Sequence, residues 1–228
     1  MKNRINFFGI IALAAITAIV LGGCGGAGNA NPATDFSYDL TADGQGIKIT
    51  GYTGTSTSVV VPEMIENLPV VEIGKDVFNG LTVTIGGTIN YLTRSEEENK
   101  NALLTFISLP DTVTTLGTYV FANTPLLTEV KLSENINYIS MDAFQKSGIK
   151  KVNLPKNLQK IGFGAFAGCG ELTELIIPDT MSEIKFMGYG HNEEDVKEDS
   201  NNYAFERCGK LPIAIRQKIQ GWGYSSVF

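Results

Sequence analysis

The chain has 228 residues, of which 43% are hydrophobic, and a formal net charge of −6. This length and apolar content suit one medium-sized or elongated domain. The 18 basic residues form no Lys/Arg run, so the sequence lacks the basic patch of a nucleic-acid-binding protein, and we predict no nucleic-acid partner.

The N-terminus has the layout of a secretory signal peptide, which we place at residues 1–23. Lys2 and Arg4 form a basic start, an apolar run covers residues 5–21, and small residues follow. A transmembrane helix is the alternative interpretation, because the run approaches the ~20 residues that span a bilayer.

The sequence LGGC at residues 21–24 resembles the bacterial lipobox. That resemblance implies cleavage before Cys24 and attachment of lipid to its sulfur and amine. Two or more acyl chains anchor a protein stably, so we expect a chain that is tethered to a membrane and does not span it. Residues 24–34 are small and polar, which is typical of a flexible tether, and residues 35–228 remain for the exported domain.

The exported domain begins with a predicted hairpin and an irregular first repeat. Residues 36–52 place Asp43-Gly44, a turn signal, between two strand-like runs. Residues 59–78 form the first repeat, which is longer than the later ones. We expect its five extra residues to bulge around Glu66–Val70.

Four further repeats follow at a regular step. Residues 104–124, 127–147 and 149–169 align with one another, and a last copy begins at 172 and is completed at 202–208. The equivalent positions, 22–23 residues apart, are Pro110, Ser133, Pro155 and Pro178. Alternating apolar and polar residues before each of them predict a short strand with one face inward. One repeat cannot bury its own apolar face, so the five copies predict stacked rungs.

Three more columns recur in the repeats. A second apolar position, which we expect to form the next side of the coil, is Leu116, Ile139, Ile161 and Ile184. Glycine follows it at Gly74, Gly117 and Gly162, where we expect a turn with positive φ. A phenylalanine column, Phe78, Phe121, Phe144, Phe166 and Phe205, predicts a stacked aromatic spine.

Two insertions and a closing segment complete the chain. Residues 79–103 contain TVTIGGTI, which predicts a hairpin on a Gly-Gly turn, and residues 185–202 are acidic. Residues 211–228 predict a closing helix, because Leu211, Ile215 and Ile219 share one helical face. We expect Trp222, Tyr224 and Phe228 to lie over the last rung.

The repeat consensus L-x-x-V-x-L-P-x-x-V-x-x-I-G-x-x-A-F-x-x-C resembles the BspA-like leucine-rich repeats, and residues 150–169 match it nearly residue for residue. The resemblance covers roughly residues 36–228. It implies a leucine-rich-repeat solenoid, mostly β, with about five rungs of short parallel strands, an N-terminal β-hairpin cap and a C-terminal helical cap. It also implies a bacterial surface or secreted protein, often a lipoprotein, with adhesion in some members and no catalytic residues.

Few side chains suggest chemistry. Cys169 and Cys208 share a column of small residues with Thr124 and Ser147, so we expect buried free thiols, and a disulfide across the two adjacent rungs stays open. His191 is the only histidine, so a catalytic pair or a zinc site lacks its ligands. We therefore predict no catalytic residue, no metal and no cofactor.

The outward strand positions form a candidate binding face, which consists of Phe106, Ser108, Glu129, Lys131, Lys151, Asn153, Glu174 and Ile176. A structural role is the alternative, because Glu129, Lys151 and Glu174 alternate in sign and could pair between rungs. We predict a lipid-anchored protein, exported to the outer surface of a bacterium, that binds a protein partner on a host or neighbouring cell without catalysis. The alternative function is a structural envelope lipoprotein that binds another envelope component.

Overall fold

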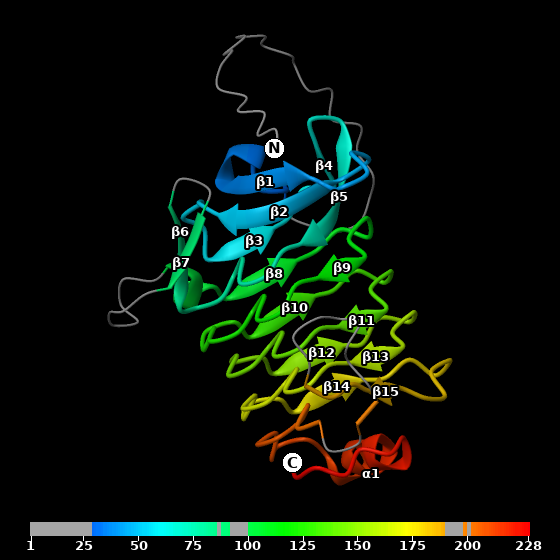
Figure 1. The fold of residues 1–228 in the computed structure, drawn as a ribbon. Helices are drawn as coiled ribbons and strands as arrows, with labels where there is room; N and C mark the ends of the chain where they lie inside the picture. Colours follow the sequence, from blue (N-terminus) through cyan, green and yellow to red (C-terminus); the bar gives the residue numbers. More distant parts are fainter. Residues whose placement is uncertain (1–28, 86–87, 92–99, 190–197, 200–201) are drawn as a thin grey trace, which may run out of the picture.

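Successive turns of the chain stack into an elongated solenoid. In Figure 1 the turns descend one beneath another from the N-terminal strands to helix α1 (Ile213–Gly221). We call each turn a rung. The computed structural model describes residues 29–85, 88–91, 100–189, 198–199 and 202–228.

A parallel sheet of five strands, which we call the first sheet, runs along one side of the solenoid. In spatial order its strands are β3 (Ser58–Val60), β8 (Phe106–Ser108), β10 (Glu129–Lys131), β12 (Lys151–Asn153) and β14 (Glu174–Ile176). Each rung contributes one strand. The central residue of every strand is buried, namely Val59, Ile107, Val130, Val152 and Leu175. Five rungs with one inward face per strand are therefore confirmed.

The next side of each rung, which we call the second side, carries shorter ladders. There β5 (Leu68–Ile73) pairs in parallel with β9 (Thr115–Leu116). A separate parallel ladder joins β11 (Tyr138–Ile139), β13 (Lys160–Ile161) and β15 (Lys185–Phe186). Two ladders on different sides enclose the core between them.

The predicted second-side column is wrong in the last rung. Phe186, and not Ile184, pairs with Ile161. Both Ile184 and Phe186 are buried, because residues two apart on an extended chain point the same way, so the alternation fits either register. The Phe186 ring lies 5.2 Å from the ring of Tyr224 in the C-terminal cap, and that contact belongs to the tertiary structure. Residues 185–186, which the sequence assigns to the acidic insertion, therefore belong to β15.

The phenylalanine spine is confirmed. Centroid distances between consecutive rings are 5.7, 5.1, 5.2 and 5.2 Å along the column Phe78, Phe121, Phe144, Phe166 and Phe205. Tyr52 extends the stack at the N-terminal end, 5.5 Å from Phe78, and Tyr224 closes it edge-on, 5.8 Å from Phe205. Such aromatic pairs contribute about 0.5–1.5 kcal/mol each beyond the area that they bury.

The N-terminal cap is a hairpin, as predicted. After the short 3-10 helix η1 (Ala33–Asp35), β1 (Phe36–Leu40) pairs antiparallel with β2 (Ile47–Tyr52), and Gly44 in the turn has a φ of 68°. Strand β2 then pairs in parallel with β5. The hairpin thus continues the second side and covers the first rung.

The expected bulge of the first rung is a second small hairpin. Strand β4 (Met64–Ile65) pairs antiparallel with the start of β5. Glu66 and Asn67 form its two-residue turn, and both have positive φ, 51° and 64°. That geometry matches the turn type that suits two-residue hairpins.

The prediction of positive φ at Gly74, Gly117 and Gly162 is wrong. These glycines are needed for close packing between rungs: a Cβ at Gly117 would lie 2.2 Å from the backbone nitrogen of Lys75. The positive φ occurs two residues before each phenylalanine of the spine, at Asp76, Tyr119, Asp142, Gly164 and Tyr203. Glycine at these three positions provides space, whereas Ser140 occupies the equivalent position of its rung and donates a hydrogen bond to the Gly117 carbonyl. The turn lies further along the chain.

The C-terminal cap follows the prediction closely. Helix α1 begins after Pro212, so Leu211 precedes it, but Leu211 and Ile219 are both buried against the last rung. The first insertion contains the predicted hairpin of β6 (Thr82–Ile85) and β7 (Thr88–Tyr91), followed by η3 (Lys100–Leu103). Within the described ranges, no helix has the length and apolarity that crossing a membrane requires.

Candidate binding face

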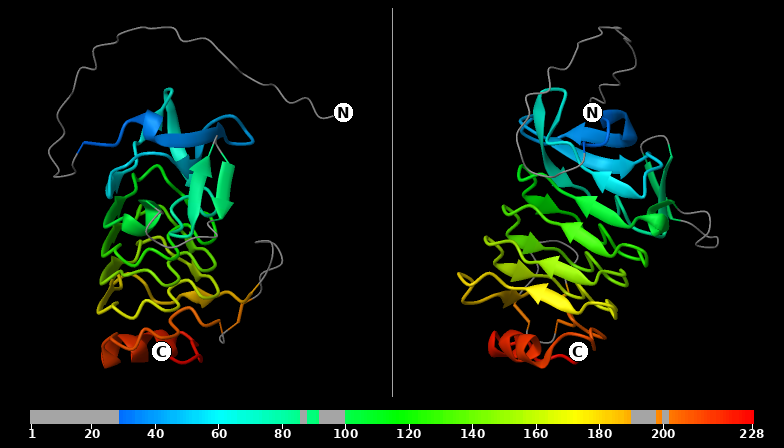
Figure 2. Two further views of the ribbon diagram at one scale, coloured as in Figure 1. Left: turned by 90° about the vertical axis from the view of Figure 1, so that its left-hand side faces the viewer. Right: turned by 180° about the vertical axis from the view of Figure 1, so that it is seen from behind.

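The first sheet aligns the predicted outward residues in two columns. Phe106, Glu129, Lys151 and Glu174 follow one another in register across β8, β10, β12 and β14. In the neighbouring column Ser108 aligns with Lys131, and Asn153 aligns with Ile176. The stacked rungs can be followed in both views of Figure 2. Side chains up to 70 positions apart in sequence, Phe106 and Ile176, thus share one surface.

Six of the eight side chains are exposed on this face: Glu129, Lys131, Lys151, Asn153, Glu174 and Ile176. Phe106 is half-buried, and Ile176 is 43% exposed. Ser108 is only 6% exposed, so the prediction that it belongs to the contact surface is wrong. Its short side chain lies between its longer register neighbours Val60 and Lys131.

One ion pair joins adjacent rungs on the face. The Lys151 Nζ atom lies 3.3 Å from Glu174 Oε2. The two side chains are 50% and 59% exposed to solvent, respectively. An exposed pair of this kind contributes at most about 1 kcal/mol. The pairing that the alternating signs allow therefore exists between Lys151 and Glu174, and its small energy leaves the face available for other contacts.

A hollow opens beside the strands of the middle rungs. Its lining residues are Phe106, Asp111, Glu129, Val130, Lys131, Leu132, Glu134 and Asn153. Asp111 Oδ1 accepts a hydrogen bond from the Glu134 backbone nitrogen at 3.2 Å, and Glu134 Oε2 accepts one from the Lys156 nitrogen at 2.9 Å. Each carboxylate is thus hydrogen-bonded to the backbone of the next rung, and this bond fixes the position of the side chain.

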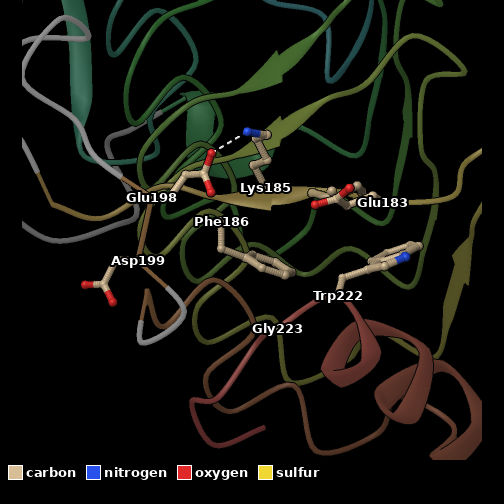
Figure 3. Close-up of a pocket in the computed structure, with 8 residues that line it drawn as sticks. Glu183, Lys185, Phe186, Glu198, Asp199, Trp222 and Gly223 are labelled. Atoms are coloured by element: carbon tan, nitrogen blue, oxygen red, sulfur yellow. Dashed lines mark hydrogen bonds and ion pairs between the residues drawn. The ribbon is translucent and has the colours of Figure 1, made fainter.

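A second hollow lies where the last rung meets the C-terminal cap (Figure 3). Lys185 Nζ contacts Glu198 Oε1 at 2.5 Å, which raises the pKa of Lys185. The Trp222 indole nitrogen donates to the Ser182 carbonyl at 2.9 Å. These contacts fasten the acidic insertion and the cap to the solenoid, so we assign this hollow a structural role.

The two cysteines are free, buried thiols, and the disulfide alternative is not formed. Cys169 Sγ donates to the Phe144 carbonyl at 3.0 Å, and Cys208 Sγ donates to the Phe166 carbonyl at 3.2 Å. Each thiol is therefore directed to the carbonyl of the preceding rung. Burial raises the pKa of Cys169 to about 12 and also raises the pKa of Cys208, so both stay protonated and unreactive at neutral pH.

The end of the predicted tether, residues 24–34, is docked on the solenoid at Asn31, so the flexible tether does not extend through this residue. Asn31 accepts a hydrogen bond from the Val60 nitrogen at 2.9 Å through Oδ1, and its own backbone nitrogen donates to the Val60 carbonyl at 2.9 Å. Asn31 therefore covers the outer edge of β3, which would otherwise offer unpaired backbone groups to another chain.

Two predicted positions cannot be placed in the structure. Cys24 and His191 both lie outside the described residues. Among the residues that are described, no group of three or more His, Cys, Asp or Glu side chains is arranged to hold a metal ion.

Sequence reasoning missed the carboxylates of Asp111 and Glu134 at the edge of the face. Both directly follow the position that ends each first-sheet strand, Pro110 in one rung and Ser133 in the next. An acid at the same offset in two successive repeats is the signal that could have identified them.

The repeat pattern has a family counterpart. Residues 95–189 match the family described as BspA type leucine rich repeat region, in 6 copies. That type is consistent with a bacterial surface module that binds protein. No curated protein matches the chain.

Solved structures with a similar arrangement are bacterial leucine-rich repeat proteins. The T. pallidum protein TpLRR is 23% identical, with 88% of this chain and 99% of that chain covered and a TM-score of 0.48. A Bacteroides ovatus protein is 20% identical, with coverage of 78% and 44% and a TM-score of 0.47. A leucine rich cell surface protein of Faecalibacterium prausnitzii is 17% identical, with coverage of 80% and 69% and a TM-score of 0.31.

Proposed function

We propose that the chain is an exported, lipid-anchored surface protein that binds a protein partner through the outward face of the first sheet. The observation that carries the proposal is the alignment of six exposed side chains from three consecutive rungs on one sheet. Ladder pairing of the strands and the buried aromatic spine of the same rungs hold these positions in register, which limits the ordering cost of binding.

The chemistry of the face suits recognition. It combines charges of both signs with Ile176 and the half-buried ring of Phe106. Polar groups around a few apolar anchors are the usual composition of a protein interface. The lipobox at residues 21–24 supports the anchor, and it would keep the solenoid at the membrane surface.

Site-specific crosslinking in intact cells tests this function. A photo-crosslinking residue at Asn153 lies on the face. One at Gln159, which is also exposed, directly precedes β13 on the second side of the same rung. We expect adducts from position 153 and few from position 159. Equal adducts from both positions, or none from position 153, would contradict the proposal.

Protease treatment of the same cells separates surface binding from an internal envelope role. An outer-surface protein is digested while the cells remain intact. A protected solenoid would favour the structural envelope lipoprotein instead.

A further inference from the structure

The hollow beside the first sheet is strongly acidic for its size. Among the described residues that line it, three carry carboxylates, Asp111, Glu129 and Glu134, and one, Lys131, carries an ammonium group. The lining therefore has a net charge of −2. Lys151, the register neighbour of Glu129 outside the lining, pairs with Glu174 at 3.3 Å.

Two of the three carboxylates, Asp111 and Glu134, are held in place by backbone hydrogen bonds. Asp111 and Glu134 each use one oxygen to accept a backbone N–H from the next rung, at 3.2 and 2.9 Å. A carboxylate has two oxygens with about four acceptor sites, so each keeps acceptor capacity after making that bond. Because the positions are already set by the rungs, a cationic ligand would not need to order them.

The hollow also has an apolar wall. Phe106 is half-buried and aligns with Glu129, while Val130 and Leu132 are buried beneath. An aromatic ring next to carboxylates suits the guanidinium group of arginine, which stacks on aromatic faces and donates to carboxylates in pairs. The aliphatic stem of arginine or lysine would cover the apolar part.

We propose that this hollow receives an arginine or lysine side chain from a basic, extended segment of the partner protein. The inference rests on the proposed function, since it assigns a chemical class to the partner of the same face. The negative charge of the hollow and its aromatic wall are complementary to such a side chain.

Peptide binding to the purified full chain in detergent tests the assignment. The probe is a fluorescent ten-residue peptide of alternating arginine and serine, and its matched control replaces each arginine by the neutral isostere citrulline. At about 50 mM salt, where screening of charges is weak, we expect the arginine peptide to bind and the citrulline peptide to bind much more weakly. Equal binding of the two peptides, or no binding of the arginine peptide, would overturn the assignment.

Charge-neutral variants locate the binding. Glu129→Gln and Glu134→Gln should each raise the Kd about two- to five-fold, the range expected for one exposed ion pair, and Lys131→Gln should lower it by a similar factor. Asp179→Asn is the matched control, because Asp179 is exposed and occupies the position equivalent to Asp111 in the last rung, outside the hollow. An equal effect of Asp179→Asn would assign binding to overall acidity and overturn the site.

A calcium titration distinguishes a metal ion from a side chain as the occupant. We expect calcium at millimolar concentration to leave the unfolding temperature of the full chain unchanged. A rise in that temperature that Glu129→Gln and Glu134→Gln abolish would show a metal site and overturn the proposal.

The proposed protein-binding function of the face and the proposed basic ligand of the hollow can be contradicted independently. If position 153 crosslinks in cells but the arginine peptide does not bind, the face binds protein and only the basic class is wrong. If the peptide binds as expected but position 153 gives no adduct, the hollow accepts cations and the proposed cellular function is wrong.

Discussion

Phe144 and Phe166 lie on adjacent rungs with ring centroids 5.2 Å apart and planes only 3° from parallel. Both rings are fully buried, and each is flanked by a further phenylalanine of the spine. Because one ring supports the next, removal of a central ring should weaken the packing of three rungs.

Replacement of Phe144 by alanine should lower the free energy of unfolding by about 3–5 kcal/mol, the range for a buried phenylalanine whose cavity does not collapse. Urea unfolding followed by circular dichroism measures the change. Phe163→Ala is the control, because Phe163 is half-buried and lies outside the spine. A loss below about 1 kcal/mol for Phe144→Ala would contradict the role of the spine.

Gly117→Ala should destabilise the protein by about 1–3 kcal/mol, since the new Cβ would overlap the backbone of Lys75 in the neighbouring rung. Gly209→Ala is the matched control, because a Cβ there meets nothing within 4 Å. We expect Gly209→Ala to change stability by less than about 1 kcal/mol. Equal losses for the two variants would show that backbone flexibility, and not space, decides the glycine column.

Both cysteines should react with a thiol reagent only after unfolding. Denatured, unreduced protein should take up two labels on Cys169 and Cys208, whereas native protein should take up neither at pH 8, because burial raises the pKa of both thiols and covers them. Mass spectrometry counts the labels. A denatured protein without label on these two residues would indicate the disulfide.

The same thiols predict a loss of stability at alkaline pH. The pKa of Cys169 is about 12 in the folded chain, above the usual value of about 8.5 of an unfolded cysteine. The folded state must then keep a proton that the unfolded state releases, so stability should fall as pH rises from about 8.5 toward 12. Cys169→Ala should remove the contribution of this thiol to the slope. An unchanged slope in that variant would contradict the assignment.

The contribution of Asp142 to the free energy of unfolding should decrease as the pH is raised from acid toward neutral. Burial raises the pKa of its carboxyl group above the usual range, although Tyr119 and Gln145 donate hydrogen bonds to it. A raised pKa in the folded state gives stability at low pH that is lost as pH rises through the raised value. The stability of the parent chain relative to Asp142→Asn should therefore decrease as the pH rises above the usual aspartate pKa of about 3.9, as followed by urea unfolding.

Asp43 provides a control of opposite sign for that experiment. A hydrogen bond from the Thr41 hydroxyl lowers the pKa of Asp43, so its contribution is present above the usual pKa and lost as the pH falls. Asp43→Asn should show the reverse dependence on pH. If the stability difference changed with pH in the same direction for both variants, a general effect of acid on the fold, and not the local environments of Asp142 and Asp43, would explain the pH dependence.

Lipid attachment can be tested independently of binding. Cells that express the full chain and are grown with labelled palmitate should label the parent protein and not Cys24→Ala. Label on the Cys24→Ala variant would place the lipid elsewhere, and an unlabelled parent protein would favour the transmembrane alternative.

Much of the fold follows from the sequence because the repeats agree in phase. The columns of Pro110 and Phe144 fix where each strand ends and where each ring stacks, and a one-residue slip would turn every inward side chain outward. The outward register of Glu129, Lys151 and Glu174 follows from the same alignment.

The misplaced features depend on contacts between rungs. Gly117 carries no sign in the sequence that distinguishes a need for positive φ from a need for space, and only the neighbouring backbone of Lys75 decides it. Phe186 and Ile184 fit the alternation equally, and the ring of Tyr224 belongs to a cap that lies far along the chain. Ser108 is buried although its position in the alternation is outward, and alternation alone does not report this difference.

The central claim is that the outward face of the first sheet binds the partner, and crosslinking rung by rung in intact cells tests it most directly. Photo-crosslinking residues at Glu129, Lys151 and Glu174 follow the face, and those at Tyr138, Lys160 and Lys185 occupy the second side of the same three rungs. The account predicts adducts with the same partner from positions 129, 151 and 174, and few from the other three. Adducts of equal or greater yield from positions 138, 160 and 185 would contradict it.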